Sequence, residues 1–344
     1  MRKLSGIGGQ ALIEGIMMKN GREYALGVRL PGGSIHVEKD TYDPVAGEGA
    51  KKIPLVRGAV TFIDSLILGI STLMRSSLLS VEEEEEADGA GEAEAGESPD
   101  TAEAGPGPEA KALEASSEKK AMTAGDKAMM GGVLLVSLAI AIVLFILLPV
   151  WITNLCRSFT ESPVLLAVIE GAVKMVIFLA YLFLISRMKD VRRTFMYHGA
   201  EHKCINCVET GHELTVDQVR EASRFHKRCG TSFLFYVVII SVIIGFFIQS
   251  GNTLLRVLLR IALLPVVAGI SYEFIRFAGM SDSKVSNALS RPGLAMQRFT
   301  TQEPTDDMIE VAIKATEAVF DWRQFLADWE KEEPGACCAD TGEQ

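Results

Sequence analysis

Long apolar stretches dominate the second half of the sequence. Residues 128–156 contain no charged side chain, and neither do residues 230–255. A helix crosses the ~30 Å hydrocarbon core of a bilayer with about 20 apolar residues, so stretches of this length favour membrane-spanning helices over buried core helices. Both stretches are therefore predicted to cross a membrane.

Two further stretches are apolar but carry charges. Residues 163–186 hold Glu170 and Lys174, and the fourth stretch is interrupted by two arginines. Residues four apart share one helical face, so Glu170 and Lys174 can neutralise each other in the membrane, as a functional or a structural pair. We predict an α-helical polytopic membrane protein with four transmembrane helices, two within 128–186 and two within 231–275.

The distribution of Lys and Arg among the loops predicts the orientation. Residues 187–230 carry nine Lys and Arg, whereas residues 154–163 carry one. Basic loops stay on the cytoplasmic side, so the positive-inside rule places the 187–230 loop in the cytoplasm. With four spans, both termini are then cytoplasmic too.

The first 80 residues are predicted to form a small cytoplasmic α+β region. Strand-favouring runs flank a Pro-Gly-Gly turn within 24–40, which is typical of a β-hairpin because glycine accepts the positive φ of tight turns. Over 58–79, apolar residues recur at three- and four-residue steps, which predicts a helix. This helix could pack in the core, lie on the membrane surface or form a fifth crossing, and Asp64 makes crossing the least favoured.

Residues 81–127 are predicted to be an acidic disordered linker. Between Glu82 and Glu109 there are 12 acidic residues and no basic one, and no large apolar residue offsets the entropy of ordering. The formal net charge of −10 therefore belongs to this segment, and the rest of the chain is close to neutral. Such a balance argues against a dedicated nucleic-acid binder.

The C-terminal part is predicted to be soluble. Residues 276–330 include an amphipathic helix from Thr305 to Trp329, with Thr305 as its N-cap. Residues 331–344 form a polar tail that contains two adjacent cysteines. Six cysteines in 344 residues are too few for a disulfide scaffold, and cytoplasmic thiols stay reduced.

The 187–230 loop concentrates residues that bind metals. Four of the five histidines and three of the six cysteines fall within 198–229. His198, Glu201 and His202 form an HxxEH sequence, the inverted order of the HExxH motif of zinc hydrolases. Histidines four apart on a helix can hold one ion, and the glutamate can take a proton from water. The expected cofactor is zinc or another divalent transition metal.

Further ligand candidates lie downstream. They are Cys207, His226 and Cys229. Two residues separate His226 from Cys229, a spacing that is common between the ligands of zinc sites. Cys204 and His212 are the weakest candidates, because either can be dropped and a full ligand set remains. The remaining question is how many of these side chains reach one ion.

Three arrangements fit these residues. In a closed arrangement, four ligands saturate a tetrahedral zinc that only holds the loop together. In an open one, three ligands leave a position for water and Glu201 serves as the catalytic base. In the third, the histidines bind no metal. The ligands of the closed arrangement come from His198, His202, Cys207, His226 and Cys229.

At these residues the sequence resembles the YqhQ-like bacterial membrane proteins, a family of unknown function described as predicted metal-dependent enzymes. The matching elements are GGQALIEGIMM (8–18), IPLVRG (53–58), YHGAEHK (197–203), Cys207-Val-Glu209, RFHKRCGTSF (224–233), PVVAGISYE (265–273) and PGLAMQRFTTQEP (292–304). The resemblance implies a multi-pass protein of the bacterial inner membrane with a metal site. It implies no substrate.

The resemblance also bears on individual residues. The residues that match the family pattern are His198, Glu201, His202, Cys207, Glu209, His226 and Cys229. Gln10 and Glu14 could line the same cleft or simply support the fold. Glu273 is an additional ligand candidate or a charge at the membrane boundary.

Two functions follow from the sequence. The first is a membrane-embedded zinc-dependent hydrolase of unknown substrate, with Glu201 as general base. The alternative is a non-catalytic scaffold or accessory protein that the metal stabilises. A metal transporter is less favoured, because its spans should carry several polar ligands. The lipid bilayer is the expected partner, and the sequence leaves protein partners and homo-oligomers open.

Overall fold

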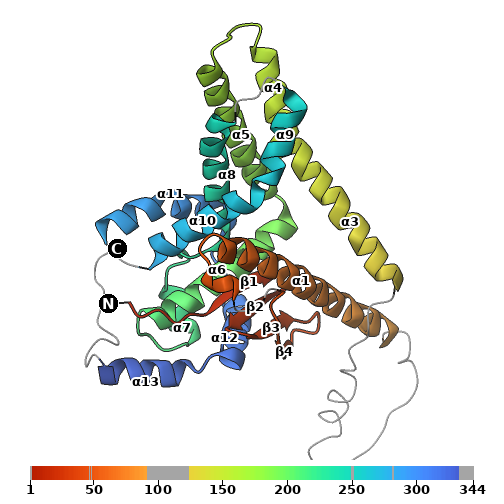
Figure 1. The fold of residues 1–344 in the computed structure, drawn as a ribbon. Helices are drawn as coiled ribbons and strands as arrows, with labels where there is room; N and C mark the ends of the chain where they lie inside the picture. The colour runs from red at the N-terminus through yellow and green to blue at the C-terminus, as the bar shows by residue number, and fades with distance from the viewer. Residues whose placement is uncertain are drawn as a thin grey trace, which may run out of the picture.

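The computed structural model describes residues 2–45, 47, 49–90, 124–248, 252–280 and 283–332. It is mostly helical, with one antiparallel sheet near the N-terminus (Figure 1). Within the predicted linker, residues 91–123 lie outside the described part of the chain, and so do Cys337 and Cys338. The flanking residues 81–90 and 124–127 continue helices.

The sheet is a four-stranded meander in which each strand pairs with the next along the chain. Its strands are β1 (Gly8–Leu12), β2 (Gly15–Asn20), β3 (Glu23–Arg29) and β4 (Ile35–Thr41). The predicted hairpin within 24–40 is confirmed as β3 and β4. The sequence pattern does not predict β1 and β2, because glycine-rich runs have low strand propensity.

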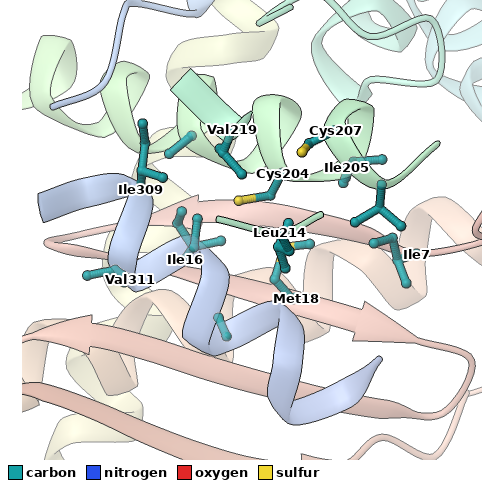
Figure 2. Close-up of a cluster of buried hydrophobic side chains, with 14 of the residues drawn as sticks. Ile7, Ile16, Met18, Cys204, Ile205, Cys207, Leu214, Val219, Ile309 and Val311 are labelled. Atoms are coloured by element: carbon teal, nitrogen blue, oxygen red, sulfur yellow. The ribbon is translucent and has the colours of Figure 1, made fainter. Parts of the chain in front are cut away.

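The two central strands of this sheet are buried on both faces. Ile16 and Met18 of β2 face α6 (Lys189–Glu209) and α12 (Asp306–Val319) in one apolar core, which Figure 2 shows. Met17 points to the opposite face, where it packs in a second core with Leu68 of α1 (Val56–Ala90). Successive side chains of a strand point to opposite faces, so the apolar run Ile-Met-Met serves both cores.

Three of the predicted spans are present as long apolar helices. The first is Gly131–Cys156, which comprises most of α3 (Ala124–Ile142), a π-helical turn (Val143–Leu147) and α4 (Leu148–Cys156). The others are α5 (Pro163–Ile185) and α8 (Gly230–Phe247). Residues Val56–Ser80 of α1 also have the length and composition of a span.

The fourth predicted span is a bent pair of helices. α9 (Thr253–Ala262) and α10 (Leu264–Gly279) meet at an angle of 46°. Pro265 lies in the first turn of α10, where its missing N–H and its ring interrupt a continuous helix. Counting this pair, the described residues contain up to five candidate spans, so the chain is a candidate multi-pass membrane protein.

The charges of the candidate span α5 pair differently from the prediction. Glu170 of α5 forms its ion pair with Arg260 of α9. Lys174, the predicted partner, instead donates from Nζ to the hydroxyl of Ser241 at 3.4 Å. A partner on a neighbouring helix neutralises Glu170 and at the same time joins α9 to α5.

The remaining helices lie toward the lower ends of α5 and α8 in Figure 1, and we call them the lower layer. The predicted helix from Thr305 to Trp329 is broken into two, because the chain is extended at Phe320. The layer consists of α7 (Val216–Glu221), α11 (Lys284–Thr300), α12 and α13 (Trp322–Glu332), of which α12 and α13 are the two halves of the predicted helix. α6 runs from the end of α5 into this layer and brings the HxxEH residues next to the sheet.

Candidate metal centre

The predicted helical placement of the HxxEH residues is confirmed, because all three lie on α6. His198 and His202 share one face, as their spacing requires, and Glu201 lies next to that face. Gly199, which weakens an isolated helix, has a steric reason: a Cβ there would collide with the carbonyl oxygen of Gln302. The glycine therefore allows the chain that follows α11 to approach α6 closely.

Three side chains converge at this point. Among the described residues, His198, His202 and Cys229 could hold a metal ion, because their ligand atoms all lie within 4.8 Å of one another. Nε2 of His198 is 3.2 Å from Sγ of Cys229, and the two imidazole centroids are 4.4 Å apart. We call these three residues the ligand group.

Backbone carbonyls fix the orientation of both histidines. Nδ1 of His198 lies 2.8 Å from the carbonyl oxygen of Thr300, and Nδ1 of His202 lies 2.7 Å from that of Arg224. A carbonyl oxygen only accepts, so each Nδ1 carries the hydrogen and Nε2 is left to face the site. Metal-binding histidines are oriented by their second nitrogen in the same way.

The charges of the ligand group are coupled. Burial raises the pKa of the Cys229 thiol, but His202 and His198 outweigh burial and hold this pKa well below its usual range. Burial lowers the pKa of His198, but the neighbouring Cys229 raises it to about 9. The result is a thiolate beside an imidazolium. A divalent cation can take the place of the shared proton, since metal ligands bind in their deprotonated forms.

Glu201 lies beside the ligand group and outside it. Its side chain is buried, and the backbone N–H of Gly9 in β1 donates a hydrogen bond to its carboxylate. Burial raises the pKa of Glu201, against the opposing effect of His198 and His202. A carboxyl group whose pKa is raised is a stronger base than an exposed one, which suits general acid–base work.

A cleft of about 670 Å³ gives access to these side chains. Its floor includes His198, Glu201 and Cys229, and its walls come from β1, α1, α8 and α10. Gln10 of β1 lines the cleft, as one of the sequence hypotheses expects. This volume lies within the range of ligand sites for small molecules.

His226 lies near the ligand group but has a different environment. Its ring centroid is 5.5 Å from that of His202. Its Nε2 is 3.8 Å from Glu209 and makes no hydrogen bond within the described part of the chain. Burial lowers the pKa of His226 to about 4, so the ring is neutral. The structure therefore brings His226 to the edge of the ligand group, facing the buried carboxylate.

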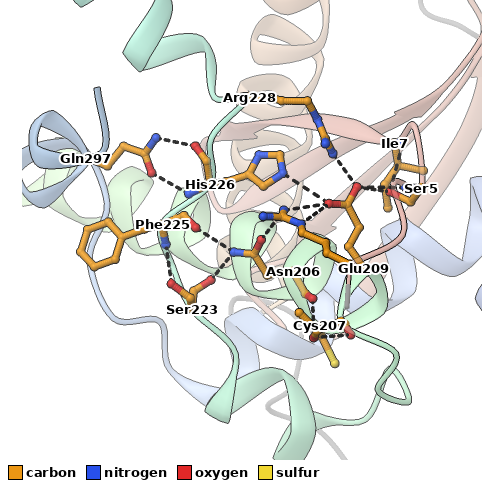
Figure 3. A network of polar contacts seen from close by, with 12 residues as sticks. Ser5, Ile7, Asn206, Cys207, Glu209, Ser223, Phe225, His226, Arg228 and Gln297 are labelled. Carbon is orange, nitrogen blue, oxygen red and sulfur yellow. Dashed lines mark hydrogen bonds and ion pairs between the residues drawn. The ribbon is translucent and has the colours of Figure 1, made fainter. Parts of the chain in front are cut away.

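Glu209 is the centre of a second polar cluster, which Figure 3 shows. Its side chain is fully buried and accepts from Arg2 at 2.7 Å, from Arg228 and from the backbone and hydroxyl of Ser5. Burial raises the pKa of Glu209, but His226, Arg228 and Arg2 outweigh burial and lower it. These residues, called the Glu209 network below, connect the N-terminus to α6 and to the segment before α8.

The two cysteines of α6 lie outside the ligand group. Cys204 and Cys207 lie in the core between α6 and the sheet (Figure 2). The thiol of Cys207 donates to the carbonyl of Glu213 at 3.3 Å. Burial raises the pKa of Cys207 to about 12 and that of Cys204 well above its usual value, so both stay protonated. His212 contacts the hydroxyl of Thr210.

Two other acidic candidates are held in ion pairs. Glu14 pairs with Arg193 of α6, and Glu273 of α10 pairs with Arg57 at the start of α1. Both pairs connect distant segments of the chain, which fits support of the fold. Sequence reasoning missed the carbonyls of Thr300 and Arg224, because a backbone atom leaves no residue-type signal. The only indication was that both residues lie in or next to the family-like motifs at 292–304 and 224–233.

Comparisons with known proteins agree with the resemblance seen in the sequence. The family described as "Protein of unknown function (DUF1385)" matches residues 53–322. The chain is 32% identical over 319 residues to the protein named "Uncharacterized protein YqhQ" from Bacillus subtilis (strain 168), covering 90% of each chain. No solved structure matches. With most of its length matched by both, the chain belongs to the DUF1385 family of proteins of unknown function.

Proposed function

We propose that this protein is a membrane-bound, metal-dependent hydrolase. His198, His202 and Cys229 would hold zinc or a similar divalent ion, and Glu201 would act as the general base. The observation that carries the proposal is a three-donor ligand group with a buried carboxylate beside it, at the floor of a cleft. Three protein ligands are typical of catalytic zinc sites, whereas structural sites use four.

The donor set fits such an ion. Two imidazole nitrogens and one thiolate are the ligand types that zinc prefers, and both histidines are oriented by backbone carbonyls. A bound divalent ion would supply Lewis-acid chemistry, polarising a carbonyl or phosphoryl group and lowering the pKa of water.

The residues of the chain would carry the proton transfers. Glu201 accepts a proton from water as the water oxygen bonds to the carbonyl carbon or phosphorus of the substrate. As the scissile bond breaks, Glu201 returns that proton to the leaving group, so one water is consumed for each bond cleaved. The hydrogen bond from Gly9 holds the carboxylate of Glu201 in place between these two steps.

We also propose that the site faces the cytoplasm of a bacterial cell, with both termini on the same side of the inner membrane. The nine Lys and Arg of residues 187–230 support this orientation, because they all lie in the segment between the end of α5 and the start of α8, which also carries the ligand group. A reducing cytoplasm also keeps the Cys229 thiol available.

One observation favours the alternative, a structural metal. The ligands come from α6 and from the residue before α8, so an ion would cross-link the lower layer to a candidate span. An ion in this role needs no open coordination position. The two functions therefore differ in whether an outside molecule can reach the metal.

Cobalt substitution tests that difference without a known substrate. Purified protein is loaded with Co²⁺, and its visible spectrum is recorded during titration with azide or acetohydroxamate. An accessible position gives a saturable spectral change, and a fourth protein ligand gives none and rejects the hydrolase. The variant Glu201→Gln should retain Co²⁺, and the exposed Glu213→Gln is the matched control. Once a substrate is found, Glu201→Gln should lose about 100-fold or more in turnover.

A further inference from the structure

Helix α1 has its two faces reversed relative to an ordinary surface helix. The face that packs on the sheet carries Asp64, Leu68, Thr72 and Ser76, each at most 3% exposed and four residues apart. Three of these four residues are polar. Thr72 and Ser76 donate to carbonyls of α1 itself, and Oδ1 of Asp64 accepts from the hydroxyl of Tyr42 and from the backbone N–H of Val45.

The outward face of α1 is apolar. Ile63, Leu66, Ile67 and Leu73 lie on this face at helical spacing and are 37–48% exposed. A helix whose polar face turned to water would place these residues inside. An apolar stripe on the outside, in a chain with several candidate spans, is the surface that a bilayer covers.

Contacts with the sheet show how α1 must lie. Gln10 donates to the carbonyl of Gly69 at 3.4 Å, and Arg75 pairs with Glu38 of β4 at 3.1 Å. Together with Asp64, these contacts follow α1 for about 16 Å, at 1.5 Å per residue. If α1 crossed the bilayer over this length, the charged sheet would have to enter the hydrocarbon with it. Figure 1 accordingly shows α1 across the lower ends of α5 and α8, over the sheet.

Residues of α1 and α8 line the cleft, and one of them, Leu66, belongs to the outward apolar face of α1. Phe62 of α1 and Phe233 of α8 contact each other across the cleft wall, with ring centroids 5.3 Å apart. Leu66 and Leu234 also line the cleft, and each is 46% exposed. Cys229 immediately precedes α8, so the ligand group is about 8 Å along the helix from Leu234.

We propose that α1 lies in the plane of the cytoplasmic leaflet and that the cleft takes a lipid laterally from that leaflet. The acyl part would lie between Leu66 and Leu234, which together we call the rim of the cleft. The polar headgroup would reach the ligand group. As the identity of a substrate, this rests on the proposed hydrolase function. A volume of about 670 Å³ holds a headgroup with part of a chain, but not a peptide helix about 10–12 Å across.

The orientation of α1 is tested by fluorescence quenching in nanodiscs. In a Trp151→Phe background, Trp is placed singly at Ile63, Ile67 and Leu73, and lipids brominated near the headgroup or deep in the acyl chain are compared. An in-plane helix gives the same ratio of shallow to deep quenching at all three positions. A ratio that changes steadily along the helix, or the absence of quenching, overturns the proposal. Trp322 and Trp329 of α13, in the lower layer, are expected to stay unquenched and serve as internal references.

Lipid entry is tested with phosphatidylglycerol that carries a diazirine in its acyl chain. Photolysis in nanodiscs should crosslink this probe to peptides containing Phe62 and Phe233. Leu66→Asp and Leu234→Asp should each reduce these crosslinks by about tenfold, because a carboxylate in the lipid path is strongly disfavoured. Leu73→Asp, on the same helix face but outside the cleft lining, is the matched control. Equal loss in Leu73→Asp, or no loss in the rim variants, overturns lateral entry.

Removal of the metal separates this inference from the proposed function. Wild-type protein stripped of its metal with a chelator should keep the acyl-chain crosslinks at Phe62 and Phe233, because the side chains along the acyl path are unchanged. Crosslinks that persist while the cobalt titration shows no open position would leave a lipid-binding cleft without hydrolysis. An open metal position without crosslinks would leave a hydrolase whose substrate comes from elsewhere. Metal content and the unfolding temperature of each rim variant establish that it has folded.

Discussion

Two buried polar clusters lie about two turns apart on α6, and they satisfy their charges in opposite ways. In the Glu209 network, one carboxylate accepts from two arginines and from Ser5, so each charge has a partner. In the ligand group, three electron-pair donors point at one another. Buried electron-pair donors that converge in this way repel one another unless they share a proton or a cation.

The difference distinguishes support from chemistry. A saturated carboxylate has no remaining capacity for a ligand, so the Glu209 network is best understood as a connection between segments. The ligand group is unsaturated, has a buried base beside it, and contributes His198 and Cys229 to the lining of a cleft. Both clusters match the family-like motifs, and only their geometry separates them.

The largest expected effect is on stability, from Glu209→Ala. Removing the carboxylate leaves Arg2 and Arg228 without their shared partner, which should cost about 3–5 kcal/mol in the free energy of unfolding. Chemical denaturation measures this loss, and Glu213→Ala, at an exposed glutamate of the same loop, should cost little. The metal content of the folded fraction should not change. A loss below ~1 kcal/mol would show that the network contributes little.

The pH dependence of stability has a defined sign for the same residue. The folded-state pKa of Glu209 lies below its unfolded value of 4.5. Its contribution is therefore complete above pH 4.5 and is lost only as the pH falls through the lowered folded-state value. The difference in stability between the wild-type protein and Glu209→Ala should thus persist down to pH 4.5 and shrink in stronger acid. A difference that already disappears at neutral pH would contradict this assignment.

The ligand group should show the opposite profile in His202→Ala. Loss of a direct ligand should weaken metal binding by more than the 10–100-fold typical of outer-shell changes, while metal-free stability changes little. Competition with a chelating dye measures the affinity, and His212→Ala is the matched histidine control. Unchanged affinity in His202→Ala would remove this residue from the ligand group.

A smaller effect should come from a residue that contacts no metal. In Gly199→Ala, the new Cβ meets the carbonyl of Gln302 and displaces the segment whose Thr300 carbonyl orients His198. Metal affinity should fall by about 10–100-fold, the usual cost of disturbing an outer-shell partner. Gly230→Ala is the control, because a Cβ there meets no atom within 4 Å. Equal affinities in both variants would mean that the carbonyl is not needed.

The parts of the fold that sequence predicted were those set by local pattern. The long apolar helices, the hairpin within 24–40 and the helical HxxEH segment follow from periodicity. The strands β1 and β2 did not, because their glycine-rich sequence becomes a strand only between two covering layers. The bend at Pro265 and the pairing of Glu170 with Arg260 depend on neighbours that one helix does not reveal.

The ligand group could be predicted only as part of a larger set. The sequence placed His198, His202, Cys207, His226 and Cys229 together as candidates. It could not show that Cys207 turns toward the sheet or that His226 faces a buried carboxylate, since both depend on how α6 is rotated in the fold. The sequence also could not predict that α1 forms a wall of the cleft, because α1 is distant in sequence from the metal-binding loop.

The smallest expected effect separates two cysteines that sequence alone treats as equals. Cys207→Ala removes a buried thiol that packs against the sheet and donates to Glu213, so it should cost roughly 1 kcal/mol of stability and leave metal affinity unchanged. Cys229→Ala should instead lose metal. Alkylation of the metal-free protein at pH 8 should modify Cys229 first, because its thiolate is stabilised by two histidines, whereas burial keeps Cys207 protonated. Loss of metal in Cys207→Ala would favour the closed, four-ligand arrangement and would make the site structural, so the variant with the least expected effect carries the sharpest distinction.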